Sequence, residues 1–168
     1  MPLDVKPLTK AARETAIDLA RTHKGVGSAL EGGGRVVVVA PNLHDQRNPD
    51  PGETVVVGVY DYKKNKTLVA LVHPKKKKVV AVEEIAAQFQ LSDEETQAAE
   101  TLAGKDKRIR SFLGKRALNP LTRLYFPPRG PQHRYAIVFA RPTNSERRYA
   151  IVDLSAGSVT DVLEKLTD

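Results

Sequence analysis

The sequence contains an internal repeat, and this repeat constrains the fold more than any other feature. Two 23-residue segments, opening at Leu8-Thr9 and Leu91-Ser92, align without gaps at an offset of 83. The matched positions are Leu8 with Leu91, Thr9 with Ser92, Ala16 with Ala99, Leu19-Ala20 with Leu102-Ala103, Lys24 with Lys107, Val26 with Ile109, Ser28 with Ser111, and Leu30 with Leu113. A second block follows in the same order, because Ala70-Leu71-Val72 resembles Ala150-Ile151-Val152 at an offset of 80. Two copies of one structural unit are therefore expected.

Each copy predicts a helix followed by antiparallel strands. Thr9 and Ser92 are good N-cap residues, and apolar residues recur at helical spacing after both. We expect Gly25 and Gly104 to end these helices. Apolar β-branched runs separated by short turns then predict four strands in each copy, at 35–40, 54–62, 67–73 and 79–83, and at 123–126, 134–140, 148–154 and 158–162. The sequence thus predicts an α+β fold of two tandem units, residues 1–83 and 84–168, each with one helix on an antiparallel sheet of about four strands.

Both faces of the first predicted sheet are apolar. Alternation along the strands places Val36, Val38, Val55, Val57 and Val59 on one face, and Val37, Val39 and Val56 on the other. One helix covers one face, so the second face must pack elsewhere. We expect the two sheets to pack on each other, or the chain to bind a protein partner or form a homodimer.

Several motifs resemble the small N-terminal domains of copper amine oxidases. Pro2-Leu3-Asp4 with Pro7-Leu8-Thr9 resembles the HPLDPLT start of the second N-terminal domain, and residues 55–82 resemble its strand-turn-strand. The segment 83–113, with LSDEETQAAETL, resembles the start of the third domain, and 149–159 carries a VDLxxGxV hairpin also found in PepSY-like domains. The resemblance implies a tandem of two cystatin-like domains over nearly the whole chain.

The same resemblance implies a fold and not amine oxidation. In that family, copper-binding histidines and a quinone-forming Tyr within Asn-Tyr-Asp/Glu belong to a large C-terminal β-sandwich. Here Val59 precedes Tyr60-Asp61, and the four histidines contain no His-x-His pair. We therefore carry over no catalytic, cofactor-binding or metal-binding residue, and we expect a non-catalytic protein.

Composition excludes several classes of functional site and of protein. The chain has 168 residues and no Cys, which excludes disulfide frameworks, thiolate metal sites and cysteine nucleophiles. No apolar run approaches the roughly 20 residues that a membrane helix needs, and the N-terminus does not resemble a signal peptide. These features predict a cytoplasmic protein that does not bind membranes.

The net charge of +7 raises an alternative, binding to nucleic acid or another polyanion. The basic residues concentrate in two predicted turns and in one segment around 105–116. The candidate polyanion-binding residues are Lys63, Lys64, Lys66, Lys75, Lys76, Lys77, Lys78, Lys105, Lys107, Arg108, Arg110, Lys115 and Arg116. The two turns lie at opposite ends of one strand, roughly 20 Å apart, and do not form one patch. Lysine-rich turns also keep sheet edges from pairing with other chains. We therefore favour the interpretation that these lysines are simply exposed to solvent over the interpretation that they bind nucleic acid.

One loop offers a catalytic interpretation. His44-Asp45 lies in a polar loop of residues 42–52, and a His beside an Asp can act as a base or a metal ligand. No third group with a fitting spacing accompanies them, so a solvated loop is favoured. The sequence predicts a protein-interaction or accessory scaffold module without cofactor, with polyanion binding as the alternative and a small enzyme as a third class.

Overall fold

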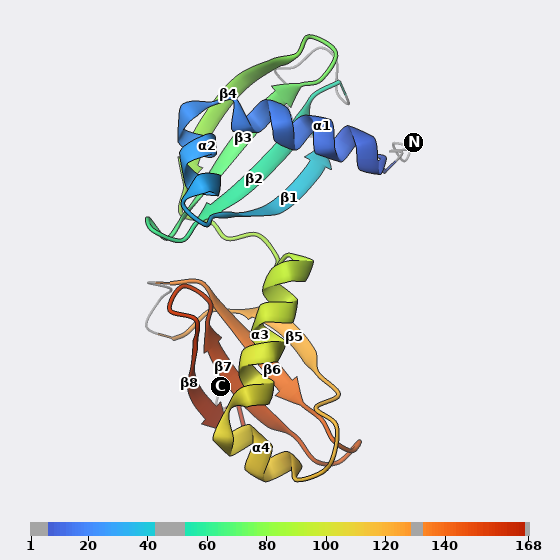
Figure 1. The fold of residues 1–168 in the computed structure, drawn as a ribbon, viewed down its shortest axis with the longest axis vertical. Helices are drawn as coiled ribbons and strands as arrows, with labels where there is room; N and C mark the ends of the chain where they lie inside the picture. Colours follow the sequence, from blue (N-terminus) through green and yellow to red (C-terminus); the bar gives the residue numbers. More distant parts are fainter. Residues whose placement is uncertain (1–6, 43–52, 129–132, 167–168) are drawn as a thin grey trace. The chain divides into compact units, whose positions relative to one another are not determined.

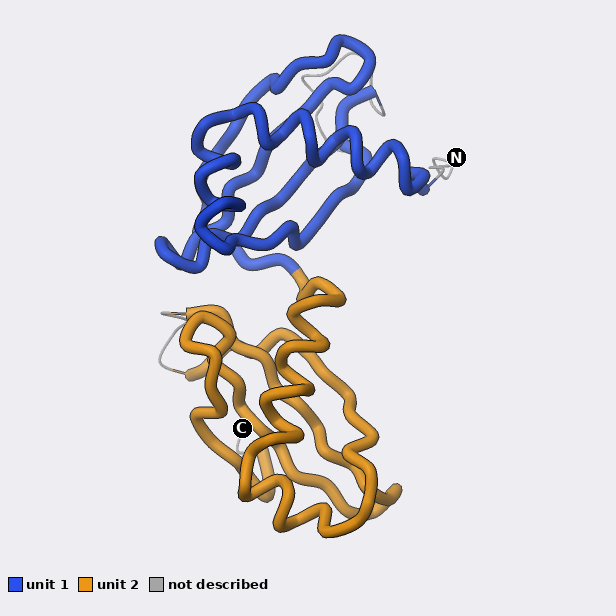
Figure 2. The backbone as a smooth tube through the Cα atoms, viewed as in Figure 1, with its two compact units in different colours: residues 1–89 blue, residues 90–168 orange. Residues whose placement is uncertain are grey.

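The computed structural model describes residues 7–42, 53–128 and 133–166, which form two compact units (Figure 1, Figure 2). Unit 1 comprises residues 1–89 and unit 2 comprises residues 90–168. In each unit, helices cover one face of a four-stranded antiparallel sheet, which confirms the expected α+β class. The expected boundary after Glu83 falls inside the last strand of unit 1, which ends at Ile85.

The order of elements is the same in both units. Unit 1 contains α1 (Lys10–Arg21), α2 (Lys24–Glu31), β1 (Arg35–Pro41), β2 (Val55–Asp61), β3 (Lys66–His73) and β4 (Lys78–Ile85). Unit 2 contains α3 (Asp93–Lys105), α4 (Lys107–Leu113), β5 (Leu121–Tyr125), β6 (Tyr135–Ala140), β7 (Arg148–Asp153) and β8 (Ser158–Leu163). Each sheet is a meander in which sequential strands are neighbours.

The prediction of one helix per unit is wrong, because each helix is divided in two at equivalent positions. Thr9 and Ser92 cap the first helices as expected. His23 and Asp106, which also match at the offset of 83, then act as N-caps and start a second helix. Gly25 therefore lies inside α2 and Gly104 inside α3, and neither ends a helix. A side chain that accepts a hydrogen bond from the amide two or three residues ahead favours a new helix start.

A β-bulge changes the predicted faces of β1. Val36 and Val39 pack with Val55, Val57 and Val59 in the core beneath the helices. The register shifts between Val36 and Val38, so Val38 pairs with Gly58 on the opposite face. The predicted faces of Val38 and Val39 are thus exchanged, because a bulge inserts one residue and inverts the alternation beyond it.

Small residues let the helices approach the sheets. Ala16 and Ala20 in unit 1, and Ala99 and Ala103 in unit 2, are fully buried against the strands. The strands contribute mainly Val and Ala to the same two cores. No helix in the described part of the chain combines the length and apolarity that crossing a bilayer requires.

The last hairpins of the two units have matching turns. His73 and Asp153 each accept a hydrogen bond from the amide three residues ahead, at 3.4 Å from Lys76 and 2.9 Å from Ala156. The left-handed position of the turn holds Lys77 in unit 1 (φ 48°) and Gly157 in unit 2 (φ 67°). The equivalence of these hairpins supports the repeat that the sequence predicts.

Candidate functional site

The face of the unit 2 sheet opposite the helices carries a cluster of large apolar side chains. We call this cluster the aromatic face; it consists of Tyr125, Tyr135, Ile137, Phe139, Tyr149, Ile151 and Leu163. Ile137, Tyr149 and Ile151 are buried at its centre, and the other four are partly buried around them. Among the described residues, the hydrophobic side chains that pack on this centre come from the strands of the sheet itself.

Strand alternation generates the aromatic face. In β6 the small or β-branched residues Ala136, Val138 and Ala140 point toward the helices, so Tyr135, Ile137 and Phe139 point to the other side. The next strand divides in the same way, because Ala150 and Val152 belong to the helix-side core while Tyr149 and Ile151 do not. Large residues thus lie opposite the helices, and small ones lie beneath them.

Ring contacts order the aromatic face. Phe139 and Tyr149 are paired across β6 and β7 and meet edge to face, with centroids 5.1 Å apart and planes at 73°. Tyr135 stacks with His133 at 6.2 Å, and His133 Nδ1 lies 2.7 Å from Asp153 Oδ2. Burial, and then the charge of Asp153, raise the pKa of the Tyr135 hydroxyl above its usual value. Both effects favour the protonated form of this hydroxyl.

Opposite charges lie at the two edges of the aromatic face. Arg123 on β5 pairs with Ile137, Ile137 pairs with Ile151, and Ile151 pairs with Asp161 on β8. Residues paired in an antiparallel sheet share a face, so one row crosses the sheet from a cation to an anion through two buried isoleucines. Both charged residues are exposed. The aromatic face therefore combines an apolar centre with a dipolar rim.

Unit 1 covers its corresponding face with its own chain. Gly58 corresponds to Phe139, and a Cβ at Gly58 would lie 3.3 Å from the Phe89 ring and 2.6 Å from Val38 Cγ1. The segment that carries Phe89 is held to the sheet by the Thr67 hydroxyl, which donates to the Ala87 carbonyl at 2.8 Å. A ring from the end of unit 1 thus occupies the position that a ring of the strand itself occupies in unit 2.

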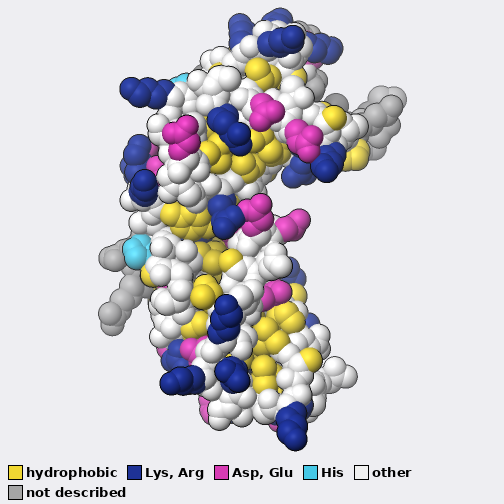
Figure 3. Space-filling view, in the orientation of Figure 1, with side chains coloured by type: hydrophobic (Ala, Val, Ile, Leu, Met, Phe, Trp, Pro, Cys, Tyr) yellow, Lys and Arg dark blue, Asp and Glu magenta, His cyan; other side chains and the backbone are white. Residues whose placement is uncertain are grey.

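The predicted lysine turns of unit 1 lie at opposite ends of β3, as expected. Lys63, Lys64 and Lys66 lie at the β2–β3 turn, and Lys75–Lys78 lie at the β3–β4 turn. Basic side chains gather near both turns in the space-filling view (Figure 3).

Carboxylates lie beside the lysines of both turns. Glu84 binds Lys66 at 2.6 Å and Lys64 at 3.6 Å, and Glu53 binds Lys75. The hydrogen bonds from Lys75 and Lys66 lower the pKa values of Glu53 and Glu84, respectively. Carboxylates therefore neutralise part of the positive charge at each turn.

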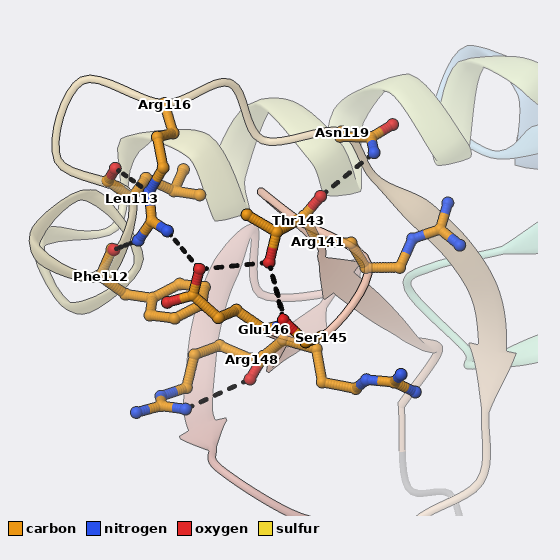
Figure 4. Close-up of polar contacts among 10 residues, drawn as sticks. Phe112, Leu113, Arg116, Asn119, Arg141, Thr143, Ser145, Glu146 and Arg148 are labelled. Atoms are coloured by element: carbon orange, nitrogen blue, oxygen red, sulfur yellow. Dashed lines mark hydrogen bonds and ion pairs between the residues drawn. The ribbon is translucent and has the colours of Figure 1, made fainter.

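The basic segment around α4 is partly neutralised too. Arg108 binds Asp106 at 2.9 Å. Arg116 donates to the carbonyls of Phe112 and Leu113 and pairs with Glu146, which fixes its guanidinium against the loop after β6 (Figure 4). Within the described residues, the candidate cations without an ion pair are Lys63, Lys76, Lys77, Lys78, Lys105, Lys107, Arg110 and Lys115.

Two shallow grooves adjoin these basic residues. One, of about 620 Å³, lies in unit 2 and is lined by Phe112, Arg116, Ser145, Glu146, Arg147, Arg148, Tyr149, Glu164 and Lys165. The Arg148 guanidinium lies 4.7 Å from the Phe112 ring centroid and pairs with Glu164 at 2.8 Å. The other, of about 590 Å³, lies in unit 1 beside His23, Asp61 and Lys63. Both grooves mix cations with carboxylates, so neither presents a uniformly positive surface to a polyanion.

The histidines are dispersed. His44-Asp45 lies outside the described residues. His23 caps α2, His73 lies 3.5 Å from Glu53, and His133 pairs with Asp153. Across the described ranges, no three His, Asp or Glu side chains are grouped as a metal ion would require.

Comparison with models of known protein families gives no match to this sequence, and comparison with curated proteins gives none. The candidate site therefore depends on the geometry of the described residues. Sequence reasoning missed the aromatic face because it examined alternation in the first copy only. The signal was present in Tyr-Ala-Ile-Val-Phe-Ala at 135–140, where large and small residues alternate.

Proposed function

We propose that this protein is a non-catalytic protein-interaction module whose contact surface is the aromatic face of unit 2. The observation that carries the proposal is the packing of four partly exposed large side chains around three buried ones on a sheet face opposite the helices. Aromatic residues are enriched at protein interfaces, and a contiguous apolar patch on a folded domain commonly marks one.

The chemistry of the aromatic face suits binding better than catalysis. Its centre offers Ile137, Ile151 and the edge-to-face pair of Phe139 with Tyr149. Such side chains give large contact areas with few rotatable bonds, which limits the entropy lost when a partner orders them. A charged rim around an apolar centre is the usual arrangement of a specific interface.

Paired substitutions at the sheet edges test this function. Tyr125→Lys and Leu163→Lys together place charges on the aromatic face at its two edge strands, β5 and β8. Val80→Lys is the matched control, because Val80 is a 48% exposed apolar residue on the edge strand β4 of unit 1. The full-length chain, immobilised and exposed to native lysate, should retain a protein partner, the control should retain it equally, and the double variant should lose it.

The comparison requires folded variants, so circular dichroism and thermal unfolding are measured on all three proteins. Equal retention by the double variant and the control, with both folded, would show that the aromatic face is not the contact surface.

We also propose that each unit is a cystatin-like domain related to the small N-terminal domains of copper amine oxidases. Supporting features are the helices on one face of a four-stranded meander and the VDLxxGxV hairpin formed by β7 and β8. In this view the chain is an accessory scaffold. An experimental structure whose two units do not superpose on those domains would contradict this relationship.

Polyanion binding is the second candidate, supported by the exposed lysines at 76–78 and by Lys105, Lys107, Arg110 and Lys115. It predicts retention on heparin at about 50 mM salt and steep loss of binding by about 200 mM. A chain that passes through heparin at the lower salt concentration does not bind polyanions.

A further inference from the structure

We infer that the partner of the aromatic face is a second copy of this chain. The two copies are related by a twofold axis parallel to the strands of the unit 2 sheet, and Arg123 of each copy pairs with Asp161 of the other. The inference rests on the proposed function, since it names the partner of the same face.

The charge pattern of one row selects this arrangement. Arg123 and Asp161 lie at the two ends of the row that crosses β5, β6, β7 and β8. In a face-to-face pair, a twofold axis along the strands reverses the strand order, so β5 of one copy lies over β8 of the other. Arg123 then meets Asp161 twice, once at each edge of the interface.

The competing twofold axis lies in the sheet plane but perpendicular to the strands. It places β5 over β5, so that Arg123 faces Arg123 and Asp161 faces Asp161. Like charges opposed across an interface are unfavourable, whereas opposite charges fix orientation. The same row therefore favours one register of a homodimer and disfavours the other.

Sheet packing distances suit this pairing. Sheets packed face to face are about 10 Å apart, with side chains from both inner faces interdigitating. A long guanidinium side chain on one edge and a carboxylate on the facing edge together span such a gap. The apolar centre between these charges can pack against any other apolar face, and the aromatic face of a second copy supplies one.

Unit 1 lacks both charges. The corresponding row, read from the strand pairing, is Ala40, Val56, Leu71 and Ala81. Its neighbouring Gly58 already receives the Phe89 ring. The combination of an apolar centre and opposite edge charges is therefore a property of unit 2.

The aromatic face is small for a protein interface. Three strand spacings give a width of about 14 Å, and six residues give a length of about 20 Å, so each copy contributes roughly 300 Å² of flat surface. This is below the roughly 800 Å² per partner of a standard stable interface. We expect a weak, reversible dimer rather than an obligate one.

Charge reversal tests the pairing directly. Sedimentation velocity of the full chain over a range of concentrations gives the dimer dissociation constant for the wild type, Arg123→Asp, Asp161→Arg and the protein with both changes. Each single reversal opposes like charges at both edges and should weaken dimerisation at least 10-fold. The double variant restores opposite charges and should return to within about 3-fold of the wild type. Both residues are exposed, but Asp161 also interacts electrostatically with Arg108 of the same chain, so the thermal unfolding of every variant is measured alongside.

Three outcomes would overturn the inference. A wild-type chain that stays monomeric at several hundred micromolar shows that the partner is not a second copy. Equal dimerisation by the wild type and both single variants shows that another surface mediates it. Failure of the double variant to recover shows that Arg123 and Asp161 do not pair. The proposed function is tested separately by the lysate experiment. If the wild type retains a protein from lysate and the Tyr125→Lys/Leu163→Lys protein does not, the aromatic face binds a partner, and that partner is a protein other than a second copy of this chain.

Discussion

Unit 1 and unit 2 share one backbone plan, but they treat the outer face of the sheet differently. In unit 1, Gly58 leaves space on that face, and Phe89 from the end of the same unit fills it. In unit 2, Phe139 stands at the corresponding position and joins a cluster that, among the described residues, is built from side chains of the strands. The comparison shows that a duplicated scaffold can keep its helix-side core while its two copies pack the second face of the sheet differently, with Phe89 in unit 1 and with side chains of the strands in unit 2.

The two units also differ at the start of the first helix. In unit 2, Glu95 caps Ser92 and binds Arg134 through two contacts, at 2.6 and 2.8 Å, with both side chains almost fully buried. The corresponding positions in unit 1 are Ala12, which carries no charge, and Glu53, which binds Lys75 near the surface. Unit 2 thus contains a buried ion pair that the corresponding positions of unit 1 do not form.

The largest expected effect comes from breaking this ion pair. Arg134→Met leaves Glu95 buried without its partner, so unit 2 should lose about 3–5 kcal/mol of unfolding free energy. Urea unfolding followed by amide hydrogen exchange, which separates the two units, measures the loss. Combining Arg134→Met with Glu95→Leu should recover much of it, because no uncompensated charge then remains. An equal loss in both variants would contradict the charge-based explanation.

An intermediate effect is expected at the close contact of unit 1. Gly58→Ala introduces a Cβ 2.6 Å from Val38 Cγ1, so the sheet must shift, and unit 1 should lose about 1–3 kcal/mol of stability. Adding Val38→Ala removes the nearest methyl group and should restore part of the loss. Hydrogen exchange of the β2 amides is the readout, with unit 2 amides as the internal control. Unchanged protection in the Gly58→Ala protein would contradict the tight packing of Val38 against Gly58.

The smallest expected effect concerns the caps of the second helices. Asp106 accepts from the amides of Arg108 at 2.8 Å and Ile109 at 3.4 Å, whereas His23 accepts from one amide, Gly25, at 3.3 Å. Asp106→Ala should therefore destabilise unit 2 by about 1 kcal/mol. His23→Asp should stabilise unit 1 by a few tenths of a kcal/mol, since Asp is among the favoured N-cap residues.

The stability that the Asp106 cap gives to unit 2 should also depend on pH. The hydrogen bond from the Arg108 guanidinium, with the amides of Arg108 and Ile109, lowers the pKa of Asp106 below its usual 3.8 against the opposing effect of burial. A carboxyl whose pKa is lowered by folding stabilises the protein above its unfolded pKa and loses this contribution as the pH falls through the folded pKa. The stability difference between the wild type and Asp106→Ala should thus be constant near neutral pH and shrink below about pH 3.8. A difference that persists in stronger acid would contradict this assignment.

Local patterns were sufficient to predict the units and their main elements. The caps Thr9 and Ser92, the alternating strands and the matched turns are read from neighbouring residues, and they give the α+β class. The division of each helix was missed because Gly25 and Gly104 looked like terminators. The capping side chains of His23 and Asp106 were the actual signal.

Part of the candidate site could be predicted from the sequence. Alternation along β6 and β7 separates large from small residues and shows that unit 2 has an apolar outer face. It does not show that Phe89 covers the same face of unit 1, because that contact joins the end of the unit to its middle strand. The lysine turns were placed correctly at opposite ends of β3, but their carboxylate partners lie on other segments.

The sequence by itself determined a duplicated α+β chain, since caps, periodicity and turn residues act over a few neighbouring positions. The tertiary structure decided the bulge that exchanges Val38 and Val39, the burial of Arg134 with Glu95, and the row that joins Arg123 to Asp161. Each of these depends on the register between segments far apart in the chain. Register follows from how whole strands and helices pack together, so it is fixed only when the unit folds.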